Sequence, residues 1–319
     1  MVKKIAFLAW AGGLVFLLTP GAIADPVDLT GLNLVGTSTI ISGGTLRLTP
    51  NYDPDPQGPI PAGAAWTTSE YNVAGGFTAN FQFQMSSPCL SPLPACVNDN
   101  GNGGDGIAFL IQNSAQGDNA IGVGAGGMGF LGITDSVAIM LDTYQNVSPN
   151  YYGDPSNNYI SVNTQGTSFN VPHHFCTGGL LTDDASIGSD LTGSVFSPDC
   201  TQNPTLGMTG YGGVNALSVN MDDGQVHDLG LIYTPGTLDI YLDSALVLSV
   251  ALDLSDILDL QNNTDAFLGF TAGTRFAYQN QDILSFDFAS VPEPVSLQFG
   301  IPAAALLLGI LRKWKRDKA

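Results

Sequence analysis

Residues 136–162 read SVAIMLDTYQNVSPNYYGDPSNNYISV, and this stretch decides the fold that we expect for the chain. It begins with an apolar run, 137–141, and ends with a second run of β-branched and aromatic residues, 159–162. Runs of this kind bounded by Asp, Asn, Gly and Pro are typical of short strands joined by a loop. We therefore predict a strand, a loop and a second strand, with oxygen-bearing side chains gathered in the loop.

The side chains of this loop are of the type that Ca²⁺ prefers. Calcium takes about six to eight oxygen ligands from carboxylates, amides and main-chain carbonyls. The same residue types are also ordinary turn formers. Composition alone therefore leaves two interpretations open, a metal loop and a plain turn.

The order of residues in the loop resembles the metal loop of the legume-type (L-type) lectin family. There, a strand ending in Glu-x-Asp-Thr-aromatic-x-Asn is followed by Gly-Asp-Pro-Ser and a His, and the matching residues here are Asp142, Thr143, Tyr144, Asn146 and Gly153–Ser156. The resemblance implies that the carboxylates of Asp142 and Asp154 hold calcium. It also implies ligands from the side-chain oxygen of Asn146 and the main-chain carbonyl of Tyr144.

Two positions depart from the family pattern. Met140 stands where the family has the Glu of a transition-metal site, and Tyr159 stands where it has the His. A thioether and a phenol are poor replacements for a carboxylate and an imidazole at a manganese-type site. We therefore predict Ca²⁺ alone, with the transition-metal site lost.

An Asp-Gly pair opens the apolar strand expected over residues 105–112. In the family, an Asp at this place follows a cis peptide bond and gives its carboxylate to the bound sugar. The resemblance therefore implies a cis bond between Gly104 and Asp105, and a sugar contact from Asp105. Without the resemblance, Asp-Gly is equally an ordinary turn.

The glycine-rich segment 122–130 lacks the Gly-Lys-Ser/Thr of a phosphate-binding loop. It matches the family segment in which a backbone N–H, from Gly127 or alternatively Gly126, points at a sugar hydroxyl. The sugar site would then gather Asp105, Gly127, Tyr144 and Asn146. Tyr144 offers a ring for the C–H face of a sugar, and Asn146 would serve both the sugar and the metal.

The last two expected strands, 266–272 and 282–288, resemble the closing strands of the family, and the loop between them is its variable specificity loop. In this chain the loop contains Arg275 and Phe276, which we take as candidate sugar contacts. For Arg275, a solubilising charge or a partner of a nearby Asp is an equally good interpretation.

Composition and pattern favour one all-β domain, and the resemblance specifies an antiparallel β-sandwich of the jelly-roll, legume-lectin kind. The 319 residues include 39 Gly and 19 Pro, and short apolar runs continue without a linker-like break. Residues 76–85 alternate apolar and polar with a period of two, as in a half-buried antiparallel strand. Residues 233–242 form two alternating runs around Pro235-Gly236, a hairpin pattern.

The charge distribution excludes nucleic acid as a partner. The formal net charge is −19, and of nine Lys and Arg only Arg47 and Arg275 lie outside the two ends of the chain. Two cations cannot neutralise a phosphate backbone. Glu70 and Glu293 are the only Glu residues, and Glu293 lies in the C-terminal segment 291–319. The domain therefore lacks the pair of Glu residues that a glycosidase of this fold would use. A catalytic pair of Asp residues stays open, but no sequence motif indicates one.

The two ends of the chain predict export. Residues 1–24 combine basic, apolar and Ala-x-Ala parts, which is the pattern of a secretory signal peptide. Residues 291–319 contain Pro-Glu-Pro, a short apolar segment and a basic cluster, and resemble the PEP-CTERM sorting signal of Gram-negative bacteria. The resemblance implies transient insertion in the inner membrane, processing by an exosortase, and release to the cell surface or an extracellular polysaccharide matrix. A plain C-terminal membrane anchor is the alternative.

An even number of cysteines outside the cytoplasm favours disulfides. We propose pairing of Cys89 with Cys96 and of Cys176 with Cys200, although four cysteines allow other pairings. The mature domain would span residues 25–290.

The expected function is that of an exported, non-catalytic, calcium-dependent carbohydrate-binding protein. One alternative is a structural matrix protein that keeps the calcium loop but binds no sugar. A less favoured alternative is a sandwich-fold glycan hydrolase that uses Asp residues. The oligomeric state is left open.

Overall fold

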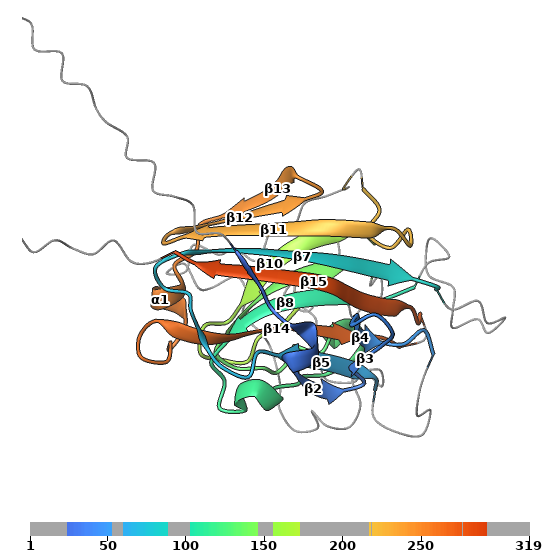
Figure 1. The fold of residues 1–319 in the computed structure, drawn as a ribbon, viewed down its shortest axis with the longest axis horizontal. Coiled ribbons are helices and arrows are strands. Elements are labelled where there is room, and N and C mark those ends of the chain that lie inside the picture. The colour runs from blue at the N-terminus through green and yellow to red at the C-terminus, as the bar shows by residue number, and fades with distance from the viewer. Residues whose placement is uncertain are drawn as a thin grey trace, which may run out of the picture.

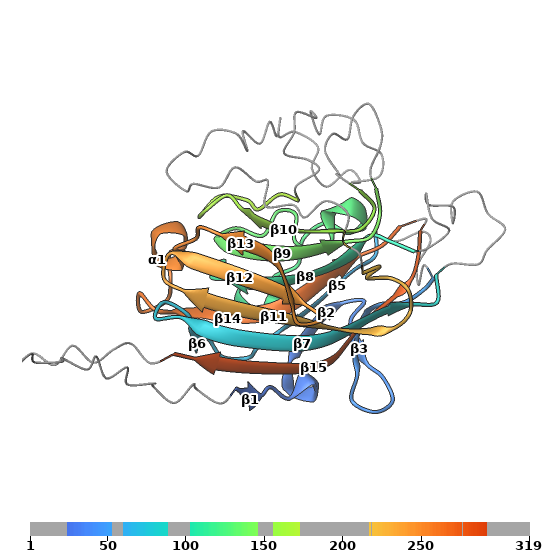
Figure 2. The ribbon, with the colours of Figure 1, turned by 90° about the horizontal axis from the view of Figure 1, so that it is seen from above.

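A computed structural model describes residues 24–52, 60–88, 103–145, 156–172, 217, 219–275 and 277–291 (Figure 1). Two antiparallel β-sheets pack face to face in this part of the chain, and the predicted all-β antiparallel sandwich is confirmed. Figure 2, turned by 90°, shows β1 beside the end of β15, which agrees with their pairing.

One sheet, which we call the back sheet, has the strand order β13-β12-β11-β7-β15-β4-β3, with β1 paired to β15. Its strands are β1 (Asp25–Pro26), β3 (Thr39–Ile40), β4 (Leu46–Thr49), β7 (Phe77–Ser86), β11 (Val226–Thr234), β12 (Thr237–Leu242), β13 (Ala245–Val250) and β15 (Asn280–Ser290). Strands distant in sequence are neighbours here, because β7 lies between β11 and β15.

The other sheet, the front sheet, has the order β10-β9-β8-β14-β5-β2, with β6 paired to β14. Its strands are β2 (Asn33–Gly36), β5 (Ala62–Trp66), β6 (Tyr71–Asn72), β8 (Gly106–Gln112), β9 (Ser136–Asp142), β10 (Tyr159–Thr164) and β14 (Asp265–Gly273). The strand, loop and strand predicted from residues 136–162 correspond to β9 and β10, which pair antiparallel.

The core lies between the two sheets, and period-two alternation produces it. Along β7, alternate residues from Phe77 to Met85 are buried, whereas the residues between them face outward. Phe81 of β7 packs on rings of the front sheet, at a centroid distance of 5.8 Å from Phe109 and 5.0 Å from Phe270. These apolar contacts hold the sheets together, since burial of aromatic area is the largest stabilising term available to such side chains.

The front sheet is buried on its outer side as well, where chain segment 117–133 covers it. Met128, Phe130 and Ile133 from this segment pack against the outward residues of β5, β8 and β9 in a second apolar cluster. The indole N–H of Trp66 donates to the Ala120 carbonyl oxygen at 2.7 Å, which attaches the segment to β5. Strands β8 and β9 therefore read as continuous apolar runs because both of their faces are buried.

The apolar runs 216–221 and 245–254 predict two further strands, and the structure differs at both. The strand expected over 245–254 ends at Val250, because α1 (Leu254–Ile257) begins there with the Asp253 carboxylate accepting from the Ser255 N–H at 3.0 Å. The sequence also predicts a short turn of helix over 255–261, and α1 is that turn, beginning one residue earlier and ending at Ile257. Residues 219–221, expected in a strand, form a loop held by Asn158, which donates to the Val219 carbonyl at 2.6 Å and accepts from the Met221 N–H at 3.2 Å.

Several predictions fall outside the described residues. These are the signal peptide, the C-terminal sorting signal and the four cysteines Cys89, Cys96, Cys176 and Cys200. Within the described ranges, no helix has the length and apolar character needed to cross a membrane.

Candidate functional site

The register of three strands brings the predicted site residues to one end of the front sheet. Gly106, the first residue of β8, pairs with Asp142 at the end of β9 and with Gly273 at the end of β14. The residue before β8 and the residues after β9 and β14 therefore adjoin one another. Hydrogen bonds from the Thr143 N–H to the Asp105 carbonyl at 2.9 Å, and from the Asp105 N–H to the Gly273 carbonyl at 3.1 Å, join these three segments.

Asp105 lies at the centre of this end of the sheet and is only 5% exposed. The Gly104–Asp105 peptide bond is cis, as predicted. The Gly104 carbonyl oxygen accepts hydrogen bonds from the Thr274 hydroxyl at 2.9 Å and from the Gln281 amide at 3.1 Å. The peptide group before Asp105 is thus held by one side chain from the segment after β14 and one from the start of β15.

Two buried glutamines, Gln279 and Gln281, donate hydrogen bonds to the segments that meet at this end of the sheet. Sequence reasoning did not identify that role. The Gln279 side-chain amide donates to the Thr143 hydroxyl oxygen at 3.0 Å, and that of Gln281 also donates to the Gly273 carbonyl at 3.3 Å. Both side chains are fully buried, and their amide oxygens have no hydrogen-bond partner among the described residues.

Asp142 ends β9 with a buried carboxylate that shapes the start of the predicted metal loop. One carboxylate oxygen accepts from the Tyr144 N–H at 2.9 Å, and the other accepts from the Tyr159 hydroxyl at 3.2 Å. The first bond closes a turn of the kind that Asp side chains favour. It brings the main chain of Tyr144, whose carbonyl is a predicted calcium ligand, next to the carboxylate.

The chemistry of these donors fits calcium, because a buried carboxylate and a main-chain carbonyl are both hard oxygen ligands. The other two predicted ligands, Asn146 and Asp154, lie outside the described residues. Among the residues that are described, no group of three His, Cys, Asp or Glu side chains could hold a metal ion. The described part of the chain therefore supplies half of the predicted ligand set.

The positions of the family's transition-metal ligands lie in an apolar environment. Met140 and Tyr159 are fully buried in the second apolar cluster, beneath the segment that covers the front sheet. The Tyr159 hydroxyl is used as a donor to Asp142. A metal at this place would have to compete with apolar packing around a thioether, which suits it poorly.

The glycine-rich segment forms a short 3-10 helix, η4 (Ala125–Gly127), beside the end of β14. The Thr271 hydroxyl donates to the Met128 carbonyl at 2.9 Å, and a Cβ added at Gly273 would meet the Ala125 carbonyl oxygen at 2.5 Å. Gly273 therefore lets β14 and this segment approach closely. Gly127 is buried and its N–H donates to the Gly124 carbonyl at 2.9 Å, whereas Gly126 is partly exposed.

Arg275 follows the end of β14 and is partly exposed, and its carbonyl accepts from the Ala277 N–H at 2.7 Å in a tight turn. Phe276, the neighbouring candidate, lies outside the described residues. The structure thus brings together Asp105, Asp142, Tyr144, the glycine-rich segment and Arg275 at one end of the front sheet.

One end of this two-sheet sandwich carries an acidic residue, a glycine-rich segment and a loop that begins with Asp. This combination is typical of lectin-like proteins. Residues 28–298 match the Legume lectin domain, which covers most of the chain, and the chain belongs to this family.

Two of the solved structures to which this chain is similar, both plant lectins, support the assignment of the fold. Peanut lectin with a nine-residue peptide is similar at 19% identity, over 84% of this chain and 96% of that chain, with a TM-score of 0.53. The lectin from Bauhinia forficata in complex with GalNAc is similar at 17% identity, over 86% and 100%, with a TM-score of 0.53. The exoplasmic/lumenal domain of VIP36 in a Ca²⁺- and mannose-bound form shares 18% identity over 84% and 86%, with a TM-score of 0.49.

Proposed function

We propose that this protein is a non-catalytic carbohydrate-binding protein whose sugar site depends on calcium. The observation that carries the proposal is the convergence of Asp105, Tyr144 and the glycine-rich segment at one end of the front sheet. Membership of the legume lectin domain family supports it, and so does the GalNAc complex of the Bauhinia forficata lectin.

The chemistry of these groups suits a neutral sugar. The Asp105 carboxylate accepts hydrogen bonds from sugar hydroxyls, and the Tyr144 ring covers a C–H face. Because the Gly127 N–H already donates within its own turn, the partly exposed Gly126 is the better candidate for a main-chain contact. Arg275 and Phe276, in the segment between β14 and β15, would contribute to specificity.

Calcium would be held by Asp142, the Tyr144 carbonyl, Asn146 and Asp154, with no transition metal beside it. When bound, calcium would fix the loop after β9 by coordinating oxygens from both of its ends. Asn146 would contact both ligand and metal, so that sugar affinity and calcium affinity depend on each other.

A glycan array probed with the full chain, in calcium and again in chelator, tests this function. We expect a group of glycans whose binding disappears in chelator and in an Asn146→Ala variant, with Asn163→Ala as a buried control on β10 away from the loop. Absence of any binding in calcium, with calcium still raising the melting temperature, would instead support a structural matrix protein. Release of reducing ends from a polysaccharide would support the hydrolase alternative.

The export route is part of the proposal. The signal peptide 1–24 would be removed, the domain 25–290 would be the mature protein with Cys89–Cys96 and Cys176–Cys200 disulfides, and an exosortase of a Gram-negative bacterium would process 291–319. The pairing of Asp25 with Phe288 supports these bounds, because the two ends of the domain meet in the back sheet. Intact-mass measurement of the protein recovered from its host, with and without reduction, tests both termini and the disulfides.

A further inference from the structure

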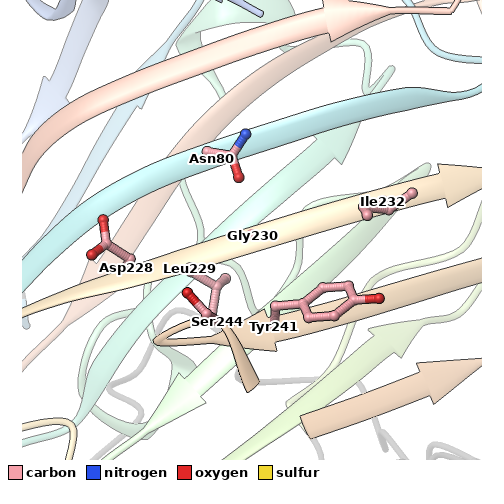
Figure 3. Close-up of a pocket in the computed structure, with 7 residues that line it drawn as sticks. All are labelled: Asn80, Asp228, Leu229, Gly230, Ile232, Tyr241 and Ser244. Carbon is pink, nitrogen blue, oxygen red and sulfur yellow. The ribbon is translucent and has the colours of Figure 1, made fainter. Parts of the chain in front are cut away.

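The outer face of the back sheet carries a hollow that has no part in the site described above. Its volume is about 340 Å³, and its lining residues come from β7, β11, β12 and the turn after β12 (Figure 3): Asn80, Asp228, Leu229, Gly230, Ile232, Tyr241 and Ser244. The outward residues of β11 alternate with core residues, so this face points away from the front sheet. The hollow is therefore separated from the front-sheet site by the core.

Gly230 creates the hollow. It stands in mid-strand, paired with Asn80 on one side and Tyr241 on the other, in two ladders that have no bulge at this point. A Cβ at Gly230 would have Asn80 Oδ1 at 3.1 Å and Tyr241 Cβ at 3.7 Å as its nearest atoms, and its φ is not positive. The backbone conformation does not require glycine here, and the one tight contact of a Cβ would be with the end of the Asn80 side chain, which would have to shift by a few tenths of an ångström. A glycine in a strand interior weakens the strand and often marks close approach of a ligand.

The walls of the hollow differ from end to end. Figure 3 shows Asp228 and Ser244 at one end, and Ile232 with the ring of Tyr241 toward the other. Neighbouring strands are about 4.8 Å apart, so the main chains of Asn80 and Tyr241 lie about 10 Å apart across Gly230, and the Asn80 amide oxygen reaches in over Gly230. The Gln82 amide donates to Asp228 Oδ1 at 2.9 Å and so orients the carboxylate at the polar end.

We propose that this hollow is a second carbohydrate site, which takes a neutral pyranose ring of a glycan chain. The Asn80 amide both donates and accepts, the Asp228 carboxylate accepts, and the Tyr241 ring offers an apolar surface, which together match hydroxyls on one edge of a sugar and C–H groups on its face. The volume is at the lower end of ligand pockets, about 300 to 1,000 Å³. An anionic ligand is disfavoured, because Asp228 lines the hollow and the chain has a net charge of −19.

Burial of this face against a second copy of the chain is the competing use. The exposed apolar side chains Val226 and Ile232 lie on the same side of β11 and would favour it. Asp228 lies between them and Asp239 lies on the neighbouring strand, and a dry interface would have to desolvate both carboxylates. A hydroxylated ligand with bridging water does not require that desolvation.

Substitution of Gly230 tests the proposal without threatening the fold. Gly230→Val fills the hollow, and Tyr241→Ala removes its aromatic wall. Thr234→Val, on the same face of the same strand but outside the hollow, is the matched control. Because valine favours strands over glycine, the melting temperature of Gly230→Val should equal or exceed that of the unmodified chain.

The full chain is applied to an array of neutral glycans in excess EDTA, which silences the calcium-dependent site proposed above. An Asp105→Ala variant in calcium provides a second way to remove that site. We expect one class of neutral glycan to be retained in both conditions, with binding weakened about tenfold or more by Gly230→Val and by Tyr241→Ala. Thr234→Val should leave it unchanged.

Three outcomes would overturn the proposal. One is that no neutral glycan is retained in either condition, and another is that Gly230→Val and Thr234→Val bind alike. The third is that sedimentation shows the unmodified chain to be a dimer that Gly230→Val dissociates, which would make this face an interface between copies. Failure of calcium-dependent binding in the unmodified chain, with EDTA-resistant binding intact, would refute the front-sheet function and leave this proposal standing.

Discussion

Substitutions of the two donors to the Gly104 carbonyl oxygen should have non-additive effects on the free energy of unfolding. The Thr274 hydroxyl and the Gln281 amide both donate to this buried oxygen, at 2.9 and 3.1 Å. Thr274→Val preserves shape and removes one donor, and Gln281→Met removes the other. Each single variant leaves one donor in place, so the Thr274→Val cost should be near that of a net hydrogen bond, about 1 kcal/mol. Gln281→Met should cost somewhat more, because the Gly273 carbonyl also loses a donor.

The double variant leaves the carbonyl without either side-chain donor. An unsatisfied buried acceptor costs about 1 to 3 kcal/mol, so the double variant should be less stable than the sum of the singles by about 1 kcal/mol or more. Urea unfolding of the four proteins at one calcium concentration measures this coupling. Additive effects, within about 0.5 kcal/mol, would show that the two side chains do not share the carbonyl.

Two further predictions concern buried titratable groups. Burial raises the pKa of Asp135, so ionisation of this carboxyl destabilises the fold as pH rises through the raised pKa. The φ of Asp135, 48°, also suits Asn. Asp135→Asn keeps the acceptor for the Asp259 N–H at 2.9 Å. It should raise stability at pH 7 and flatten the pH dependence of stability above the ordinary pKa of Asp, measured by urea unfolding; an unchanged or lower stability would contradict this. Burial also raises the pKa of Tyr233 to about 12, so this group stabilises the fold below its ordinary pKa of 10 and that contribution is lost as pH rises toward 12. Tyr233→Phe should remove this alkaline dependence of stability. Because the hydroxyl accepts from the Leu254 N–H at 2.9 Å, the variant should also lose about 1 to 2 kcal/mol of stability at pH 7. Melting curves from pH 7 to 11 that match those of the unmodified chain would refute this prediction.

Much of the fold could be predicted from the sequence where one physical rule dominates. Strand β7 was predicted from alternation, because one of its faces lies on the core and the other faces outward. The hairpin of β11 and β12 was predicted from its turn residues, and β12 is the second of the two alternating runs. The strand at 245–254 was too long, because the Asp253 cap of α1 competes locally with strand continuation.

The candidate site could be predicted only in part. Asp105, Asp142 and Tyr144 are found from the resemblance, since they lie in contiguous motifs. Gln279 and Gln281 could not be found, because their burial depends on partners brought from far along the chain: Gln281 and Gly104 are 177 residues apart. Polar residues at the start of a strand predict solvent exposure, and only the packed structure shows that these amides donate to buried groups, the Thr143 hydroxyl and the Gly104 carbonyl.

The hollow over β11 is also invisible to pattern analysis. Gly230 interrupts an alternating strand, and sequence alone cannot distinguish a bulge from a gap left for a ligand. The uninterrupted pairing of Gly230 with both neighbouring strands excludes the bulge.

The most direct test of the central claim is a calcium titration of the full chain by calorimetry, without and with a saturating amount of the glycan selected on the array. If Asn146 and the loop after β9 serve both ligands, the glycan must tighten calcium binding by the factor by which calcium tightens glycan binding. We predict one calcium per chain and a gain in calcium affinity of about tenfold or more with the glycan present. Equal calcium affinity with and without the glycan would contradict the account, because sugar and metal would then occupy independent sites.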